Sequence, residues 1–137
     1  MTQEDKSLLL KDLCGRLPYG LKVKCEKYLF PVTILYGGNI DEVKFIETGG
    51  IENICAIKPY LFPLSSMTDK DLIKFLQIKG MNLNSDELKT FRRGTTVIVS
   101  TLPSYSRHID WLNKNHFDYR GLIEKGLAID ATGLNIY

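Results

Sequence analysis

The hydrophobic positions follow a helical period at the start of the chain and then change to a period of two. Leu9, Leu13 and Leu17 repeat at steps of four residues, with Leu10 beside them, which predicts a helix over about residues 3–14. Thr2 and Asp5 stand where the reciprocal hydrogen bonds of an N-terminal capping box form. We therefore expect a first helix with a leucine face turned to the core.

Alternation of apolar and polar residues predicts four short strands after this helix. The strands are expected at 21–26, 32–36, 42–47 and 51–57. Paired glycines fall between the later ones, where tight reversals need positive φ angles. Strands joined by such short turns predict an antiparallel meander rather than a parallel α/β sheet.

The pattern changes again at residues 58–67, where Pro59 and Pro63 interrupt an aromatic and aliphatic run. Prolines disfavour a central strand, so we expect this segment to cross the surface of the meander. Beyond it, helices are predicted at 69–79 and 103–115 and a fifth strand at 95–101. Residues 81–94 leave open a short helix that begins near Ser85 and is closed by Gly94. The expected fold is α+β: a small twisted antiparallel sheet or partly open barrel of about five strands, with about three packed helices.

The composition agrees with one globular domain over residues 1–137. The chain has 137 residues, of which 44% are hydrophobic and 25% charged, and a length below about 150 residues favours a single domain. The longest nearly apolar run, 28–36, is far shorter than the ~20 residues a membrane helix needs. The first six residues lack the basic and apolar parts of a secretion signal. We expect a cytoplasmic protein with no membrane contact.

The cysteines support the same compartment. Cys14, Cys25 and Cys55 are separated by 11 and 30 residues, whereas structural zinc sites pair ligands about two to four residues apart. Their odd number and apolar surroundings favour reduced thiols that fill the core. No metal or cofactor is expected from them.

Charged residues are spread evenly along the chain, and this distribution bears on whether the partner is a protein or a nucleic acid. Lys and Arg number 18 against 16 Asp and Glu, and no quarter of the chain departs from neutrality by more than two charges. A nucleic-acid-binding domain usually shows a basic cluster and a pI above about 9, but the pI here is 8.4. A protein partner or self-association is therefore favoured over nucleic acid.

The sequence shows no catalytic arrangement. His108 and His116 are eight residues apart, which on a helix places them ~12 Å from each other, too far to share one metal ion. The glycine pairs are not followed by the helix and the Lys-Ser/Thr pair of a phosphate-binding loop. We expect a non-enzymatic protein without a cofactor, whose biochemical activity the sequence does not name.

Two groups of residues are candidates for binding a partner. The first is an aromatic and basic cluster near the third predicted helix: Trp111, His116, Phe117, Tyr119 and Arg120. Trp, Tyr and Arg dominate the energetics of protein interfaces. The same residues would also serve as core if the end of the helix turned into an apolar tail. Core and interface both remain open for this cluster.

The second group lies on the first predicted strand and directly after it: Lys22, Lys24, Lys27 and Tyr28. It is a possible nucleic-acid-binding face, which is the alternative to a protein partner. Lysines beside aromatic rings on a small sheet bind single-stranded nucleic acid in some five-stranded barrels. The competing interpretation is an edge strand that lysines protect from pairing with other chains.

Three blocks carry a resemblance to a family. They are LPYG at 17–20, KPYLFPLSSMT at 58–68 and WLNKNHFDYRGLIEKGLA at 111–128. Together they resemble a family of small uncharacterised proteins of phages, prophages and mobile elements of gut anaerobic bacteria. The resemblance implies origin and an intracellular location, and it brings no activity and no site residues. With the flat charge distribution, it favours an intracellular accessory protein that binds a protein partner.

Overall fold

A computed structural model describes residues 1–37, 42–78 and 106–137. Three helices lie in these parts: α1 (Gln3–Arg16), α2 (Asp69–Gln77) and α4 (Ser106–Lys114). The predicted capping box is confirmed, since Thr2 caps α1 with Asp5, and Thr68 caps α2 with Asp71 in the same way. Within the described ranges, no helix has the length and apolar character needed to cross a membrane.

The strands of the described residues form one mixed sheet. They are β1 (Lys22–Cys25), β2 (Val32–Gly37), β3 (Glu42–Phe45), β4 (Ile51–Asn53), β5 (Ile57–Pro63), β6 (Phe117–Asp118) and β7 (Ile129–Asp130). Their order is β4-β3-β2-β1-β5-β6, with β7 also paired to β5. The predicted antiparallel meander is confirmed for β1–β4, and β5 continues it beside β1. The class is α+β, as expected; the sheet is not closed into a barrel, and β6 and β7 pair with β5 in parallel.

The prediction for residues 58–67 is wrong over most of its length, because β5 lies inside the sheet rather than across its surface. Its prolines occupy places where the ladder tolerates them: Pro59 is the last partner of β1, opposite Val23, and Pro63 ends the strand. The predicted fourth strand is shorter than expected, since a 3₁₀ turn over Ile54–Ala56 separates β4 from β5. The predicted strand at 95–101 and the short helix left open at 81–94 lie outside the described residues.

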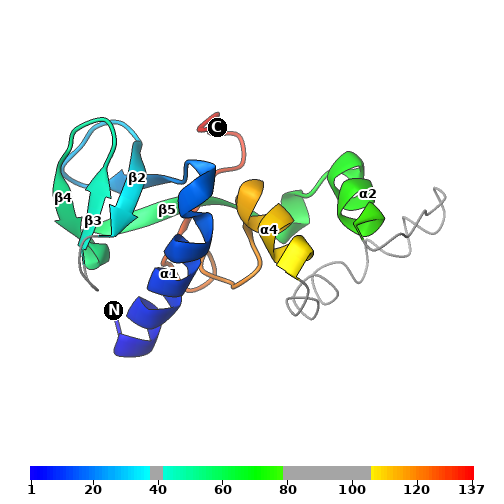
Figure 1. The fold of residues 1–137 in the computed structure, drawn as a ribbon, viewed down its shortest axis with the longest axis horizontal. Helices are drawn as coiled ribbons and strands as arrows, with labels where there is room; N and C mark the ends of the chain where they lie inside the picture. Colours follow the sequence, from blue (N-terminus) through cyan, green and yellow to red (C-terminus); the bar gives the residue numbers. More distant parts are fainter. Residues whose placement is uncertain (38–41, 79–105) are drawn as a thin grey trace.

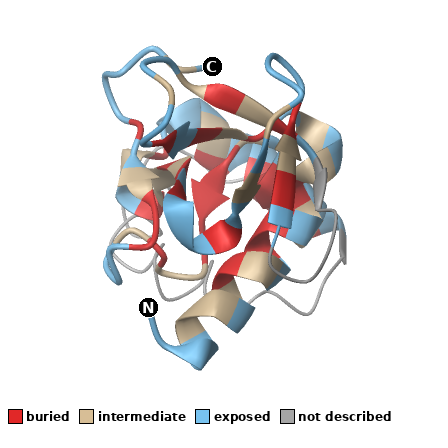
Figure 2. Cartoon of the chain, turned by 90° about the vertical axis from the view of Figure 1, so that its left-hand side faces the viewer, coloured by how far each residue is buried: buried red, intermediate tan, exposed pale blue. Residues whose placement is uncertain are grey.

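One face of the sheet packs against α1 and forms the first hydrophobic cluster. Leu9 and Leu13 of α1 meet the alternate side chains of the strands, among them Val23 and Phe45, and each of these four is at most 2% exposed. Figure 1 shows α1 lying beside the strands, and Figure 2 shows the buried segments gathered where helix and strands face each other. We call this the inner face of the sheet.

A second, more aromatic cluster lies between α2, α4 and β6. Phe75 of α2 contacts Trp111 of α4, and Trp111 stacks on Phe117 with ring centroids 5.6 Å apart. Leu72 and Leu112 are also buried in this cluster. The chain therefore has two neighbouring apolar clusters, and the polar groups that lie between them form the first candidate site.

Candidate functional site

A buried ion pair on α1 lies at the junction of the two clusters. Asp12 and Arg16 are one helical turn apart, and neither is exposed to solvent. Arg16 donates from Nε to Asp12 Oδ2 at 2.7 Å and from Nη2 to Oδ1 at 3.0 Å. Such a two-bond pair has the geometry that offsets the desolvation of both charges.

Arg16 also joins α1 to the second cluster. Its Nη2 donates to the carbonyl of Phe117 at 2.8 Å, and Nη1 lies 3.5 Å from the carbonyl of Leu112. Every guanidinium nitrogen of Arg16 thus has an acceptor within the protein. Arg16 is therefore a structural residue that links α1 to the second cluster. Its guanidinium is paired with Asp12 and backbone carbonyls and is not exposed to solvent.

Arg120 is the second arginine at this junction. Its Nε lies 3.3 Å from Asp12 Oδ1, and its Nη2 donates to the hydroxyl of Tyr119 at 3.0 Å. Tyr119 in turn donates to Asn113 Oδ1 at 3.1 Å, and its ring lies within cation–π distance of both Arg16 and Arg120. The Arg120 side chain is 20% exposed, so it connects the buried pair with the surface.

The structure buries most of the predicted aromatic and basic cluster. His116, Phe117 and Tyr119 are at most 8% exposed, whereas Trp111 and Arg120 are half-buried. Phe117, Trp111 and Tyr119 pack in the second cluster, and Tyr119 also contacts Arg120 at the junction. The five residues are close together, but they do not form one exposed surface.

His116 lies against Tyr137, with ring centroids 3.9 Å apart and an angle of 12° between the rings. Burial and the positive charge of Arg16 lower the pKa of His116 to about 4, so its ring is neutral at pH 7. Tyr137 donates to the carbonyl of Tyr60 and accepts from the N–H of Lys22, which extends the β1–β5 ladder beyond its last residue pair. The imidazole of His116 therefore stacks on the Tyr137 ring, while the Tyr137 hydroxyl bridges β1 and β5.

The predicted lysine face is divided by the structure. Lys22 and Lys24 alternate with buried Val23 and point away from the inner face. Lys27 instead pairs with Glu52, at 2.6 Å, and Tyr28 packs edge-on against buried Phe45. Glu52 is opposite buried Val43, so Lys27 and Tyr28 reach around to the inner side.

The edge-strand interpretation of these lysines is wrong, because β1 has β2 on one side and β5 on the other. Sequence reasoning also missed Lys58, which is directly opposite Lys24 in the antiparallel β1–β5 pair. Both side chains are exposed, and like charges at this position repel each other. We call the side of the sheet that points away from α1 the outer face, and Lys22, Lys24 and Lys58 form its basic half.

The other half of the outer face has three exposed aliphatic side chains beside Lys44 of β3. Leu35 of β2, Ile46 after β3 and Ile51 of β4 are 48%, 56% and 54% exposed. Ile51 is the register partner of Lys44, and Ile46 extends the β2–β3 ladder by donating to the carbonyl of Thr33. Thr33 of β2 is also opposite Lys22 of β1. Only strand β2 therefore separates Ile46 from Lys22 of the basic half. No helix packs on this side in the described parts of the chain (Figure 1).

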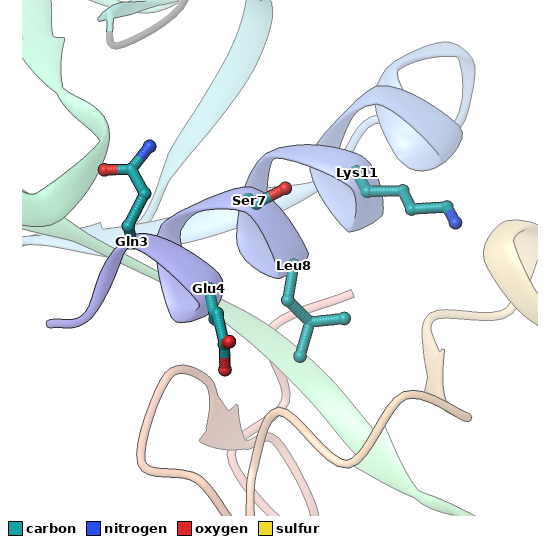
Figure 3. A pocket seen from close by; sticks show the side chains of 5 residues that line it. All are labelled: Gln3, Glu4, Ser7, Leu8 and Lys11. Carbon is teal, nitrogen blue, oxygen red and sulfur yellow. The ribbon is translucent and has the colours of Figure 1, made fainter.

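Two surface hollows differ in how they arrange polar groups. A hollow of about 470 Å³ runs along α1, but its polar side chains spread apart, with Gln3 and Lys11 pointing in opposite directions (Figure 3). A hollow of about 400 Å³ between residues 63–65 and 118–124 is lined by Tyr119 and Arg120, and so reaches the junction. Of the two, only the second brings a charged group of the buried network to the surface.

Chemically, these arrangements are suited to binding. Among residues 1–37, 42–78 and 106–137, no three His, Cys, Asp or Glu side chains gather as a metal site. No family model, curated protein or solved structure matches the chain. The outer face and the junction are the two candidate binding regions of the described residues.

Proposed function

We propose that this is a non-enzymatic binding protein whose outer face binds a protein partner. The observation that carries the proposal is the exposure of Leu35, Ile46 and Ile51 on one side of a sheet whose opposite side is a closed core. Aliphatic groups gathered on an exposed face mark interaction sites more often than scattered ones do. Strands whose side chains are held by the sheet also form a preorganised surface, which lowers the entropy cost of binding.

The basic half of the outer face narrows the kind of partner. Lys24 and Lys58 are opposite each other in the antiparallel pair, so an acidic group placed between them would remove a repulsion and gain two attractions. Beside them, Ile46 and Ile51 offer apolar contact. The partner surface that fits is a protein segment with aliphatic side chains next to aspartate or glutamate.

Affinity capture from the cells that make the protein tests this proposal, with and without nuclease treatment. We expect capture of a protein that survives nuclease and is lost in the variant Ile46→Asp. The variant Ile73→Asp is the matched control, because Ile73 is an exposed isoleucine, 38% accessible, on α2 rather than on the outer face. Equal melting temperatures of the two variants show that the difference is not one of folding.

The proposal is contradicted if Ile46→Asp captures the same protein as the unmodified chain. Loss in both Ile46→Asp and Ile73→Asp also counts against it, since the effect would then not depend on the outer face. The charge variant Lys24→Glu is expected to weaken capture as well. Its effect should shrink at high salt, because exposed charges are screened.

Single-stranded nucleic acid is the second candidate, favoured by one specific observation. Lys22, Lys24 and Lys58 lie on adjacent strands beside Tyr60 of β5, so three cations and an aromatic ring share the basic half. If three lysines contact phosphates, the logarithm of the binding constant should fall with a slope of roughly −2 against the logarithm of salt concentration. A labelled oligonucleotide that binds without salt dependence, or equally well to Lys24→Glu, removes this candidate.

The cysteines and the sequence blocks bear on where this binding takes place. The prediction that the cysteines fill the core is wrong for Cys14 and Cys55, which are exposed free thiols, and holds for Cys25, which is buried and free. Free surface thiols are typical of a reducing compartment, so we place the protein in the cytoplasm. The resemblance of three blocks to proteins of phages and mobile elements is retained as a prediction of origin.

A further inference from the structure

The segment that follows β7 is attached to the sheet through one side chain. Ala131 still donates to the carbonyl of Leu61 at 2.8 Å, next to the pairing of β7 with β5. Residues 132–137, which we call the tail, then form a loop without helix or strand (Figure 1). In the described parts of the chain, the hydrogen bonds that join the tail to β1 and β5 are all made by the hydroxyl of Tyr137.

Tyr137 is held from two sides. Its hydroxyl accepts from the N–H of Lys22 at 3.1 Å and donates to the carbonyl of Tyr60 at 2.9 Å, so it bridges β1 and β5. Its ring lies on the ring of His116, with centroids 3.9 Å apart, and 6.0 Å from the ring of Phe62. The tail is therefore a strap that one aromatic side chain fastens.

His116 is the fixed partner in this contact. Its N–H donates to the carbonyl of Asn113 in α4 at 3.1 Å, and its carbonyl accepts from the N–H of Phe62 in β5 at 2.9 Å. These bonds hold its backbone whether or not the tail is in place. Any movement that separates the two rings is therefore a movement of the tail.

The closed contact suits only a neutral imidazole. Nδ1 of His116 is buried without a hydrogen-bond partner in the described residues, and a protonated ring has two N–H donors that need acceptors. Burial and the positive charge of Arg16 lower the pKa of His116 to about 4. Moving the tail away would give the ring to water, which supplies an acceptor and solvates the charge.

The other groups around the contact offer no free counter-ion. Asp12 of α1 is already paired with Arg16 and Arg120. Asp118 of β6 accepts two backbone N–H groups of the loop that follows it. Burial raises the pKa of Tyr137 to about 12, so its phenol is neutral, and β1 and β5 meet this phenol with backbone groups. Protonation of His116 therefore acts against the closed tail.

We propose that the tail is a pH-sensitive latch, which is closed while His116 is neutral and opens when His116 is protonated, freeing the ends of β1 and β5. The tail belongs to neither hydrophobic cluster, so it can open while the core stays folded. With a pKa of about 4 under the closed tail and about 6–6.5 in water, the opening constant should rise about tenfold to thirtyfold from pH 8 to pH 5. The latch does not depend on the binding role of the outer face.

Hydrogen exchange of the Lys22 amide, followed by NMR on the full chain, measures the opening directly, because this amide donates to Tyr137. Its protection factor is the ratio of intrinsic to observed exchange rate, which removes the pH dependence of the exchange chemistry itself. We expect it to fall about tenfold to thirtyfold from pH 8 to pH 5. It should not respond to about 1 M urea, because a local opening exposes little surface.

The amide of Phe45, which donates to the carbonyl of Gly50, is the reference for global unfolding. If Lys22 and Phe45 show equal protection factors and an equal urea response, the tail opens only with the whole chain, and the proposal is overturned. A Lys22 protection factor that stays constant from pH 8 to pH 5 overturns it as well.

Variants test the coupling from the opposite direction. Tyr137→Ala removes the fastening side chain, so the pKa of His116, read from its imidazole NMR signals, should rise from about 4 to about 6 or above. Leu134→Ala removes an exposed side chain of the same tail and is the matched control, which should leave the pKa unchanged. His116→Asn should abolish the pH dependence of Lys22 exchange, since asparagine tolerates the φ of +60° but does not titrate. An unchanged His116 pKa in Tyr137→Ala, or a pH dependence that survives in His116→Asn, contradicts the latch.

Discussion

The two faces of the sheet differ more than any other pair of regions in the molecule. Phe45 and Ile46 are neighbours in the sequence, yet Phe45 on the inner face is 0% exposed and Ile46 on the outer face is 56% exposed. The inner face is closed by α1, while the outer face keeps three aliphatic side chains and a pair of opposed lysines in solvent. The difference indicates that the inner face supplies stability, and it is the reason why we propose the outer face as the binding surface.

Charges follow the same division. On the inner side of the molecule, Asp12 and Arg16 are fully buried and fully hydrogen-bonded to each other and to the backbone. On the outer face, Lys24 and Lys58 are opposite each other at a cost in repulsion. A pair that lowers stability and remains exposed is what we expect of residues used for recognition.

Breaking the buried ion pair should have the largest effect. Asp12→Ala leaves Arg16 buried without its carboxylate, which should lower the free energy of unfolding by about 4–5 kcal/mol. Urea unfolding followed by circular dichroism measures this change. Lys11→Ala, at the exposed neighbouring position of α1, should cost less than about 0.5 kcal/mol. Similar losses in the two variants would mean that the pair does not hold the clusters together.

The neighbouring residues Phe45 and Ile46 test the difference between the faces directly. Phe45→Ala removes a ring from the first cluster and should destabilise the protein by about 3–4 kcal/mol. Ile46→Ala removes a side chain already in solvent and should change stability by less than about 0.5 kcal/mol. A large loss for Ile46→Ala in the isolated protein would show that the outer face is part of the core.

Acid should weaken the junction through His116. Because its pKa is about 4 in the folded chain against 6.5 when unperturbed, the unfolded chain takes up a proton first as the pH falls. The His116 contribution is fully present above pH 6.5 and decreases toward pH 4, by about 2 kcal/mol after allowance for its partial solvent contact. His116→Asn tolerates the φ of +60° at this position and should remove this part of the pH dependence. An unchanged acid profile in that variant would exclude His116 as the cause.

The smallest effect is expected on the outer face, and it has the opposite sign. Lys24→Glu replaces the repulsion with Lys58 by an attraction and should raise the free energy of unfolding by about 0.5 kcal/mol. The double variant Lys24→Glu/Lys58→Glu restores a like-charge pair and should lose that gain. A double-mutant cycle at low salt measures the coupling. Absence of coupling would mean that the two lysines do not interact across the strands.

The sequence predicted the elements whose evidence is local. Period and capping residues were enough for α1 and α2, and alternation with turn glycines was enough for β1–β4. The strand β5 was missed because prolines were read as excluding it, whereas only their place in the ladder decides whether they are tolerated. Without β5, Lys58 could not be assigned a position opposite Lys24.

The junction left a signal in the sequence that was not used. Asp12 and Arg16 lie on the same helical face as Leu9 and Leu13, so an acid and a base four residues apart occupied predicted core positions. Arg120 could not be joined to them from sequence, because its contact with Asp12 spans 108 residues. The sequence also did not decide whether the aromatic and basic cluster is core or interface, since burial of Phe117 and Tyr119 depends on how distant elements pack.

Site-specific photocrosslinking in the producing cells tests the difference between the two faces most directly. A benzoylphenylalanine placed at position 46 on the outer face should form an adduct with a protein partner. The same residue placed at position 73, which is exposed on α2, should form none. An adduct at 73 but not at 46, or equal adducts at both, would contradict the assignment of the outer face as the binding surface.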